Sequence, residues 1–145
     1  MMKTTEPRAT HLKDYRPPAY RITDIELDFH LDSLATRVTS IMQVERLAPK
    51  PEPLQLDGQR LKLISIKLDG KPLDSTAYGA DESSLTLHAP PASFTLEIVT
   101  EIAPAENTAL EGLYMAGGIY CTQCEPEGFR CITYFIDRPD NLARF

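Results

Sequence analysis

The sequence lacks the features that would point to a membrane or a nucleic acid as its partner. No apolar run approaches the roughly 18 residues that a membrane-spanning helix needs, and residues 1–8 lack the apolar core of a signal peptide. The formal net charge is −6, and the densest cationic run, residues 62–71, is diluted by leucine and isoleucine. Because nucleic-acid binding relies on Lys and Arg to neutralise phosphates, we expect neither a nucleic acid nor a membrane as partner.

The sequence also lacks the short motifs of common catalytic and metal sites. It contains no H-E-x-x-H, no G-x-S-x-G, no Walker loop and no G-x-G-x-x-G. Its three histidines, at positions 11, 30 and 88, are isolated from one another, so structural or solvent-facing roles are expected for them. We therefore predict no catalytic residue and no metal ligand within these 145 residues.

Cysteine is scarce, and the three thiols form an odd number. This count fits a reducing compartment better than a disulfide framework, which favours the cytoplasm. Cys121 and Cys124 have the C-x-x-C spacing of redox and zinc motifs, but zinc needs about four ligands and only Cys131 lies nearby as a third. Small buried or half-buried thiols are the favoured interpretation, with a thiol or metal protein as an alternative.

What the chain does have is proline and alternating hydrophobicity. Twelve prolines against seven glycines argue against a helical bundle. Apolar residues alternate with polar ones over residues 25–31 and again over 38–44, with a turn at Asp32–Ser33. This pattern predicts an antiparallel hairpin of half-buried strands whose acids face water.

Further short strands are expected along the chain, which predicts an all-β fold. The apolar positions of residues 61–68 slip in phase, so we expect a β-bulge near Leu63–Ile64. Roughly seven to nine strands at a spacing of 8–12 residues are typical of an antiparallel β-sandwich or of curved open sheets. The other expected strands are residues 54–56, 84–87 and 94–102.

The two ends of the chain are expected to differ from the strands between them. Residues 1–18 are predicted to be a lead-in segment, because Arg16-Pro17-Pro18 stops any helix. Residues 19–145 are predicted to form a single β-rich domain. At its end, residues 137–145 predict a short helical turn, with Pro139 at the first helical position.

One carboxylate stands out as a possible ligand-binding group. Glu125 precedes Pro126, which holds its backbone extended or in a turn, and Gln123 lies two residues before it. A carboxylate on such a stiff loop can accept hydrogen bonds from a cationic ligand such as an amine. On composition alone, however, a solvated surface acid is the commoner role for such a residue.

The sequence resembles the bacterial aminopeptidase N family, the zinc-dependent alanyl aminopeptidases with the gluzincin H-E-x-x-H motif. The resemblance covers essentially the whole chain and is most specific from residue 107 to the end. It rests on NTALEGLY at 107–114, CTQCEPEGFR at 121–130 and ITYFIDRPD at 132–140, with support from DYRPPAY at 14–20, DIEL at 24–27 and LKL at 61–63.

The resemblance implies that residues 19–145 are a fragment of a larger N-terminal domain. In the family this domain is β-rich and saddle-shaped, and it packs against a thermolysin-like catalytic domain that binds zinc and is followed by helical domains. The catalytic and C-terminal domains are absent from this chain, so the fragment alone is expected to be inactive and to bind no zinc. Its implied partner within the parent enzyme is that enzyme's own catalytic domain.

The resemblance also implies a role for Gln123 and Glu125. They match the Gln and Glu of the family's T-Q-x-E motif, which hold the free α-amino group of a peptide N-terminus and shape the first specificity pocket. Cys131 departs from the pattern, since close relatives are expected to have His there. A stand-alone β-sandwich binding module without enzymatic activity is the alternative to this interpretation.

Overall fold

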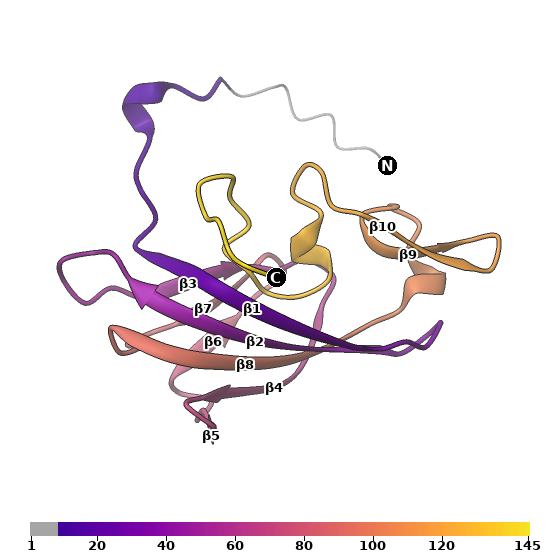
Figure 1. Ribbon diagram of the computed structural model, residues 1–145, viewed down its shortest axis with the longest axis horizontal. Coiled ribbons are helices and arrows are strands. Elements are labelled where there is room, and N and C mark those ends of the chain that lie inside the picture. The colour runs from indigo at the N-terminus through magenta and orange to yellow at the C-terminus, as the bar shows by residue number, and fades with distance from the viewer. Residues whose placement is uncertain (1–8) are drawn as a thin grey trace.

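The computed structural model describes residues 9–145, and its regular structure is antiparallel strand with only three short 3₁₀ turns, η1 (Leu12–Asp14), η2 (Pro104–Glu106) and η3 (Phe129–Cys131). A five-stranded sheet has the order β1-β2-β8-β4-β5, formed by Tyr20–His30, Thr36–Arg46, Ser93–Ile102, Lys62–Leu68 and Lys71–Pro72. A three-stranded sheet has the order β3-β7-β6, formed by Leu54–Asp57, Ser84–Leu87 and Tyr78–Ala80. A separate hairpin joins β9 (Gly112–Ala116) and β10 (Ile119–Gln123). The predicted all-β antiparallel fold is confirmed (Figure 1).

Alternation of side chains explains why β2 and β8 lie at the centre of the large sheet. Period two sends alternate residues to one face, and Met42 and Leu96, which are directly paired across the two strands, are both fully buried. Their polar neighbours Gln43 and Thr95 lie on the opposite face, where the Thr95 hydroxyl donates to Gln43 Oε1 at 3.1 Å. The sequence pattern therefore fixes which face of the sheet forms the core.

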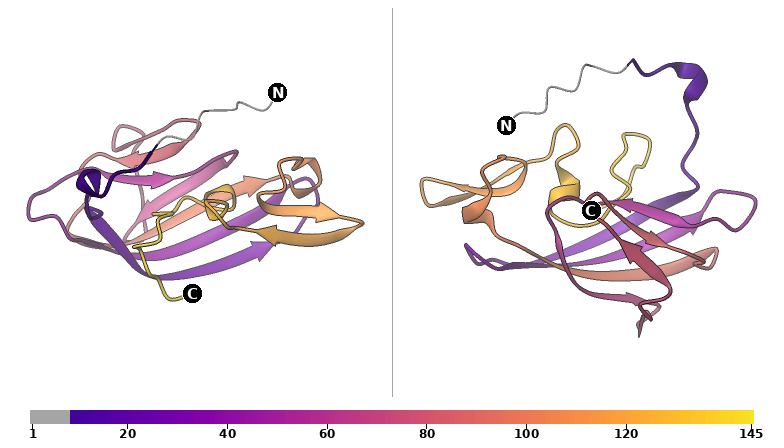
Figure 2. Two further views of the ribbon diagram at one scale, coloured as in Figure 1. Left: turned by 90° about the horizontal axis from the view of Figure 1, so that it is seen from above. Right: turned by 180° about the vertical axis from the view of Figure 1, so that it is seen from behind.

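The smaller sheet covers that inner face. In β3 and β7, Leu54, Leu56, Leu85 and Leu87 are almost completely buried and belong to the same hydrophobic cluster as the inner side chains of the large sheet. The segment after η3 also enters this cluster through Tyr134, Phe135 and Ile136. Figure 2 shows the two layers and the curvature of the long strands. The predicted sandwich with curved sheets is thus the observed arrangement.

The predicted bulge is confirmed, and a second one is present. The register of β4 against β8 shifts between Leu63 and Ser65, where the apolar phase slips in the sequence. The register of β1 against β2 shifts between Ile22 and Asp24, a position at which no bulge was expected. The hairpin of β1 and β2 itself forms as predicted.

The predicted helical turn at residues 137–145 is wrong. The segment has a single tight turn and then pairs with the edge of β1, where Arg144 N donates to Thr23 O and Ile25 N donates to Arg144 O, both at 2.9 Å. Asn141 Oδ1 accepts a hydrogen bond from Ile22 N at 2.9 Å, which holds the C-terminal segment against the edge of β1. Because the edge strand offers unpaired backbone groups, extended pairing replaces the local helical tendency.

Part of the predicted lead-in lies outside the described residues, namely 1–8. From residue 9 onward the segment is exposed up to Pro17, with η1 as its only regular element. Two contacts tie it to the C-terminal segment: the Tyr15 hydroxyl donates to Asp140 Oδ2 at 3.0 Å, and Arg138 Nη2 donates to Arg16 O at 2.9 Å. Over residues 9–145, no helix has the length and apolar character that crossing a membrane requires.

Candidate functional site

The two residues predicted to bind a substrate lie at the end of the β9–β10 hairpin. The hairpin projects at one end of the molecule (Figures 1 and 2). Gln123 is the last residue of β10 and pairs with Gly112, the first residue of β9. A four-residue turn, 125–128, then leads into η3.

The structure brings Gln123 and Glu125 into direct contact. The side-chain amide of Gln123 donates from Nε2 to the backbone carbonyl of Glu125 at 2.7 Å. Both residues are exposed, and within residues 9–145 the Glu125 carboxylate has no hydrogen-bond or ion-pair partner. Gln123 therefore holds the backbone on which Glu125 is presented, while the carboxylate itself faces outward.

The shape of the turn depends on Gly128. Its backbone N–H donates to Cys124 O at 2.8 Å and closes the turn that carries Glu125. A Cβ atom at this position would lie 2.4 Å from Gln123 O and 2.8 Å from Cys124 Cα, both backbone atoms. Only glycine allows this close approach. The Glu125–Pro126 peptide bond is cis, and the turn forms at the place where Pro126 predicts one.

The start of the hairpin is fixed in a similar way. Gly112 has φ +74° and presses against Cys131 of η3, where an added Cβ would lie 2.7 Å from Cys131 Cβ. The Asn107 side chain donates from Nδ2 to Glu111 O at 2.7 Å and to Leu113 O at 2.9 Å. These contacts hold the partner strand of Gln123 in place. Asn107, Gly112 and Gly128 were not selected from the sequence, although a glycine directly after the Glu-Pro-Glu run is a usable signal for a tight turn.

The three cysteines differ in exposure: Cys121 and Cys124 are half-buried and Cys131 is buried. All three are free, and burial raises the pKa of the Cys124 and Cys131 thiols. A raised pKa disfavours the thiolate, which is the form in which a cysteine acts as a nucleophile. Arg60 Nη2 donates to Cys131 Sγ at 3.2 Å without reversing this direction. Between residues 9 and 145 there is no group of three or more His, Cys, Asp or Glu suited to a metal ion.

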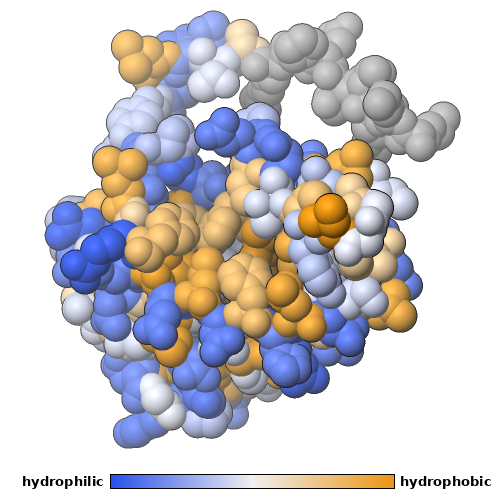
Figure 3. Space-filling view, turned by 45° about the vertical axis from the view of Figure 1, so that its right-hand side comes forward, coloured by the Kyte–Doolittle hydropathy of each residue, from blue (hydrophilic) through white to orange (hydrophobic). Residues whose placement is uncertain are grey.

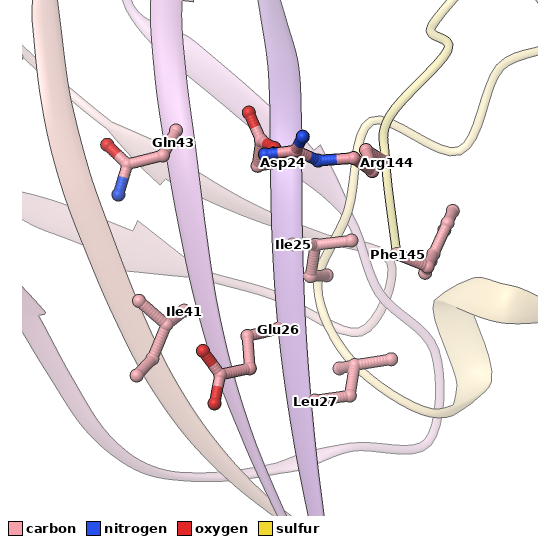
Figure 4. Close-up of a pocket in the computed structure, with 8 residues that line it drawn as sticks. All are labelled: Asp24, Ile25, Glu26, Leu27, Ile41, Gln43, Arg144 and Phe145. Atoms are coloured by element: carbon pink, nitrogen blue, oxygen red, sulfur yellow. The ribbon is translucent and has the colours of Figure 1, made fainter.

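A hollow among the described residues lies away from Gln123 and Glu125. It has a volume of about 600 Å³ and is bounded by β1, β2 and the C-terminal segment, with Arg144 reaching toward Asp24 in an ion pair (Figure 4). Four other hollows among the described residues are likewise lined by residues other than Gln123 and Glu125. The two predicted residues are exposed and line none of these five hollows.

Hydrophobic side chains are also exposed on the surface of the described residues. Figure 3 shows such side chains gathered across the middle of one face of the molecule. A contiguous apolar surface of this kind is typical of a contact with another protein or domain. The large hydrophobic residues that are at least 38% exposed are Leu12, Tyr15, Phe29, Leu31, Leu34, Leu47, Leu110, Ile119, Leu142 and Phe145.

The chain is similar in sequence and in structure to parts of bacterial aminopeptidases. The chain is 51% identical over 144 residues to aminopeptidase N of Caulobacter vibrioides, covering 99% of the chain. It is 51% identical over 142 residues to aminopeptidase N of Escherichia coli K12, covering 98% of the chain. Among solved structures, Legionella pneumophila aminopeptidase A in complex with aspartic acid matches with a TM-score of 0.83 and 28% identity over 92% of this chain and 16% of its own length.

More distant structures share the fold alone. An M1 zinc metallopeptidase from Deinococcus radiodurans, bound to a Tyr-Ser-Ala substrate, matches with a TM-score of 0.69 at 14% identity, over 86% of this chain and 31% of its own length.

The chain spans only 17% and 16% of the length of the two aminopeptidase N relatives. The model of the peptidase M1 N-terminal domain matches residues 16–145. The chain therefore belongs to the family of peptidase M1 N-terminal domains.

Proposed function

We propose that this chain is the first part of the N-terminal domain of a zinc-dependent aminopeptidase that releases N-terminal amino acids from peptides. The observation that carries the proposal is its 51% identity to aminopeptidase N over 144 residues. That match includes the run in which Gln123 and Glu125 touch. Residues 19–145 wall one side of the active site, and catalysis belongs to a domain outside this chain.

In this function Glu125 anchors the substrate's α-amino group. Its carboxylate accepts hydrogen bonds from the ammonium, a charge-assisted interaction that is stronger than a neutral hydrogen bond. When the catalytic domain covers the site, both the carboxylate and the ammonium would be costly to bury without a partner of opposite charge. A free N-terminus supplies that partner and an internal amide does not, so the site distinguishes the two. The anchor also sets the register, with one residue before the scissile carbonyl. Gln123 assists by holding the Glu125 backbone.

The zinc of such an enzyme belongs to the catalytic domain. The described residues offer no suitable group of ligands, so no step of the reaction is assigned to a metal on this chain. The domain's partners are peptide N-termini and the enzyme's own catalytic domain, for which the exposed apolar side chains provide a contact surface. The three free thiols fit a cytoplasmic enzyme.

The test is peptidase activity on alanyl-4-nitroanilide with added zinc. We expect the proposed full-length enzyme to hydrolyse the substrate and the 145-residue chain to remain inactive. In the full-length enzyme, Glu125→Ala is expected to lower kcat/KM at least tenfold, which corresponds to about 1.4 kcal/mol. Glu82→Ala is the matched control, because Glu82 is also an exposed acid but lies between β6 and β7.

Two results would contradict the proposal. Activity in neither form would favour a stand-alone β-sandwich binding module. Activity in the full-length enzyme that Glu125→Ala leaves unchanged would remove the anchoring role while keeping the family function.

A further inference from the structure

Arg130 clamps the segment that directly follows the Glu125 turn. It lies in η3, and its Nε donates to Asp137 Oδ2 at 2.9 Å while its Nη2 donates to Asp137 O at 3.0 Å. Its own backbone N–H also donates to Asp137 Oδ2, at 3.2 Å. Both side chains are largely buried, with 14% and 16% exposure. A partly buried, multiply bonded pair of this kind holds its geometry far better than an exposed ion pair.

The clamp is anchored in the two-sheet core. Asp137 N donates to Asp57 Oδ2 at 3.1 Å, and Asp57 is the last residue of β3. Asp57 in turn exchanges two backbone hydrogen bonds with Phe135, of 2.8 and 3.1 Å. Gln59 N donates to Arg130 O at 2.9 Å. The position of η3 is therefore fixed by contacts to residues more than 70 positions earlier in the chain.

On its other side the clamp is continuous with the Glu125 turn. Cys131 N donates to Gly128 O at 3.0 Å, and Gly128 N donates to Cys124 O at 2.8 Å. Arg130 Nη1 also lies 3.8 Å from Glu127 Oε2. Since the Glu125 carboxylate has no partner of its own within residues 9–145, its location depends on this hydrogen-bonded backbone.

We propose that Arg130, through Asp137, is a positioning residue that holds the Glu125 carboxylate where a substrate ammonium meets it. This inference rests on the proposed function of Glu125. Arg130 touches no substrate; it acts by fixing η3, and through Gly128 the turn. The planar guanidinium makes several bonds at fixed angles, which a lysine ammonium cannot reproduce. The charge alone is therefore not sufficient, and the fork of donors is the essential feature.

The test measures steady-state kinetics of the zinc-loaded full-length enzyme on alanyl-4-nitroanilide. Arg130→Lys and Asp137→Asn are both expected to lower kcat/KM roughly tenfold, mainly through a higher KM, because substrate binding is weakened. Asp137→Asn keeps the shape of the side chain, so it tests the clamp if Arg130→Lys fails to fold. Thermal unfolding of each variant records the structural effect separately.

A double-mutant cycle with Glu125→Ala separates positioning from a merely structural role. If Arg130 acts through Glu125, adding Arg130→Lys to Glu125→Ala causes no further loss of kcat/KM. Arg21→Lys is the matched control, since Arg21 forms an ion pair with Glu45 on the exposed side of β1 and β2 and should leave kcat/KM unchanged.

The outcomes distinguish the two proposals. If Glu125→Ala leaves kcat/KM unchanged, the proposed function of Glu125 fails, and the positioning role fails with it. If Glu125→Ala is impaired but Arg130→Lys and Asp137→Asn match the parent, only the positioning role is overturned. Losses that multiply in the double variant would likewise show that Arg130 acts independently of Glu125.

Discussion

The five-stranded sheet and the segment from residue 112 to residue 131 are held in place by different kinds of contact. In the sheet, alternate apolar residues such as Met42 and Leu96 are fully buried against a second layer. In the segment, Gln123 and Glu125 are exposed, and their backbone is fixed by the close approach of Gly128 and by the Arg130 clamp. Burial orders the sheet. The segment also has buried residues, such as Leu113 and Cys131, but the turn that carries Glu125 is fixed by close backbone approach and hydrogen bonds.

This difference separates stability from function. A group that must meet a substrate has to remain accessible, so it cannot be held by its own burial. Polar contacts from its neighbours then carry the ordering. We therefore expect changes in the sheet mainly to alter the free energy of unfolding, and changes in the segment to alter catalysis in the full-length enzyme as well.

Leu96→Ala should produce the largest change in the free energy of unfolding. It tests whether burial holds the five-stranded sheet. Leu96 is fully buried in β8, so its truncation leaves a cavity that costs about 2–5 kcal/mol in the free energy of unfolding. Urea unfolding of the 145-residue chain measures this. Leu142→Ala is the control, because Leu142 is 87% exposed. Equal stabilities for the two variants would show that burial in the sheet does not hold the fold.

Gly128→Ala should produce the next largest change in the free energy of unfolding. It tests whether close backbone approach holds the turn that carries Glu125. The added methyl meets backbone atoms that cannot move aside easily. We therefore expect the free energy of unfolding to fall by about 1–3 kcal/mol and the turn to be distorted. Gly79→Ala is the control, because its nearest neighbours are ring atoms of His88 at 3.8 and 4.0 Å. In the full-length enzyme, Gly128→Ala should also lower kcat/KM. A variant with parental unfolding and kinetics would contradict the account of the turn.

The smallest change in the free energy of unfolding is expected from replacing Asp81. This residue is held by hydrogen bonds in a turn between β6 and β7, so polar contacts also order turns of the two-sheet framework. Hydrogen bonds from the Ser83 backbone and hydroxyl, and from Ser84, hold the pKa of its carboxyl below the ordinary value of 3.8. Because the folded pKa is the lower one, its contribution to stability is present above pH 3.8 and is lost as the pH falls through the folded value.

The stability difference between the parent chain and Asp81→Asn measures this contribution across pH. It should be present at about pH 7 and shrink steadily on acidification toward about pH 2. A difference that stays constant over this range would mean that the Asp81 charge does not contribute.

Much of the framework could be predicted from the sequence because alternation is a local signal. The phase slip at Leu63–Ile64 correctly indicated a bulge. The same kind of signal is present in β1, where the apolar residues Ile22 and Ile25 are three positions apart and the register shifts between Ile22 and Asp24. The helical turn at residues 137–145 was mispredicted because the competing partner, the edge of β1, lies more than 100 residues away.

The site was harder to predict from local patterns. Gln123 and Glu125 were selected through the resemblance of the surrounding run to a family, and their mutual contact is a finding of the structure. Arg130 carries no local signal, because its importance comes from Asp137 and, beyond it, from Asp57 at the end of β3. Contacts between distant segments leave no periodic trace in a single sequence.

The most direct test of the account is a crystal structure of the proposed full-length enzyme with a free amino acid bound in its active site. The account predicts that the ammonium nitrogen lies within about 3 Å of a Glu125 carboxylate oxygen, the distance of a charge-assisted hydrogen bond. An ammonium held by other residues, with the Glu125 carboxylate facing water, would contradict it.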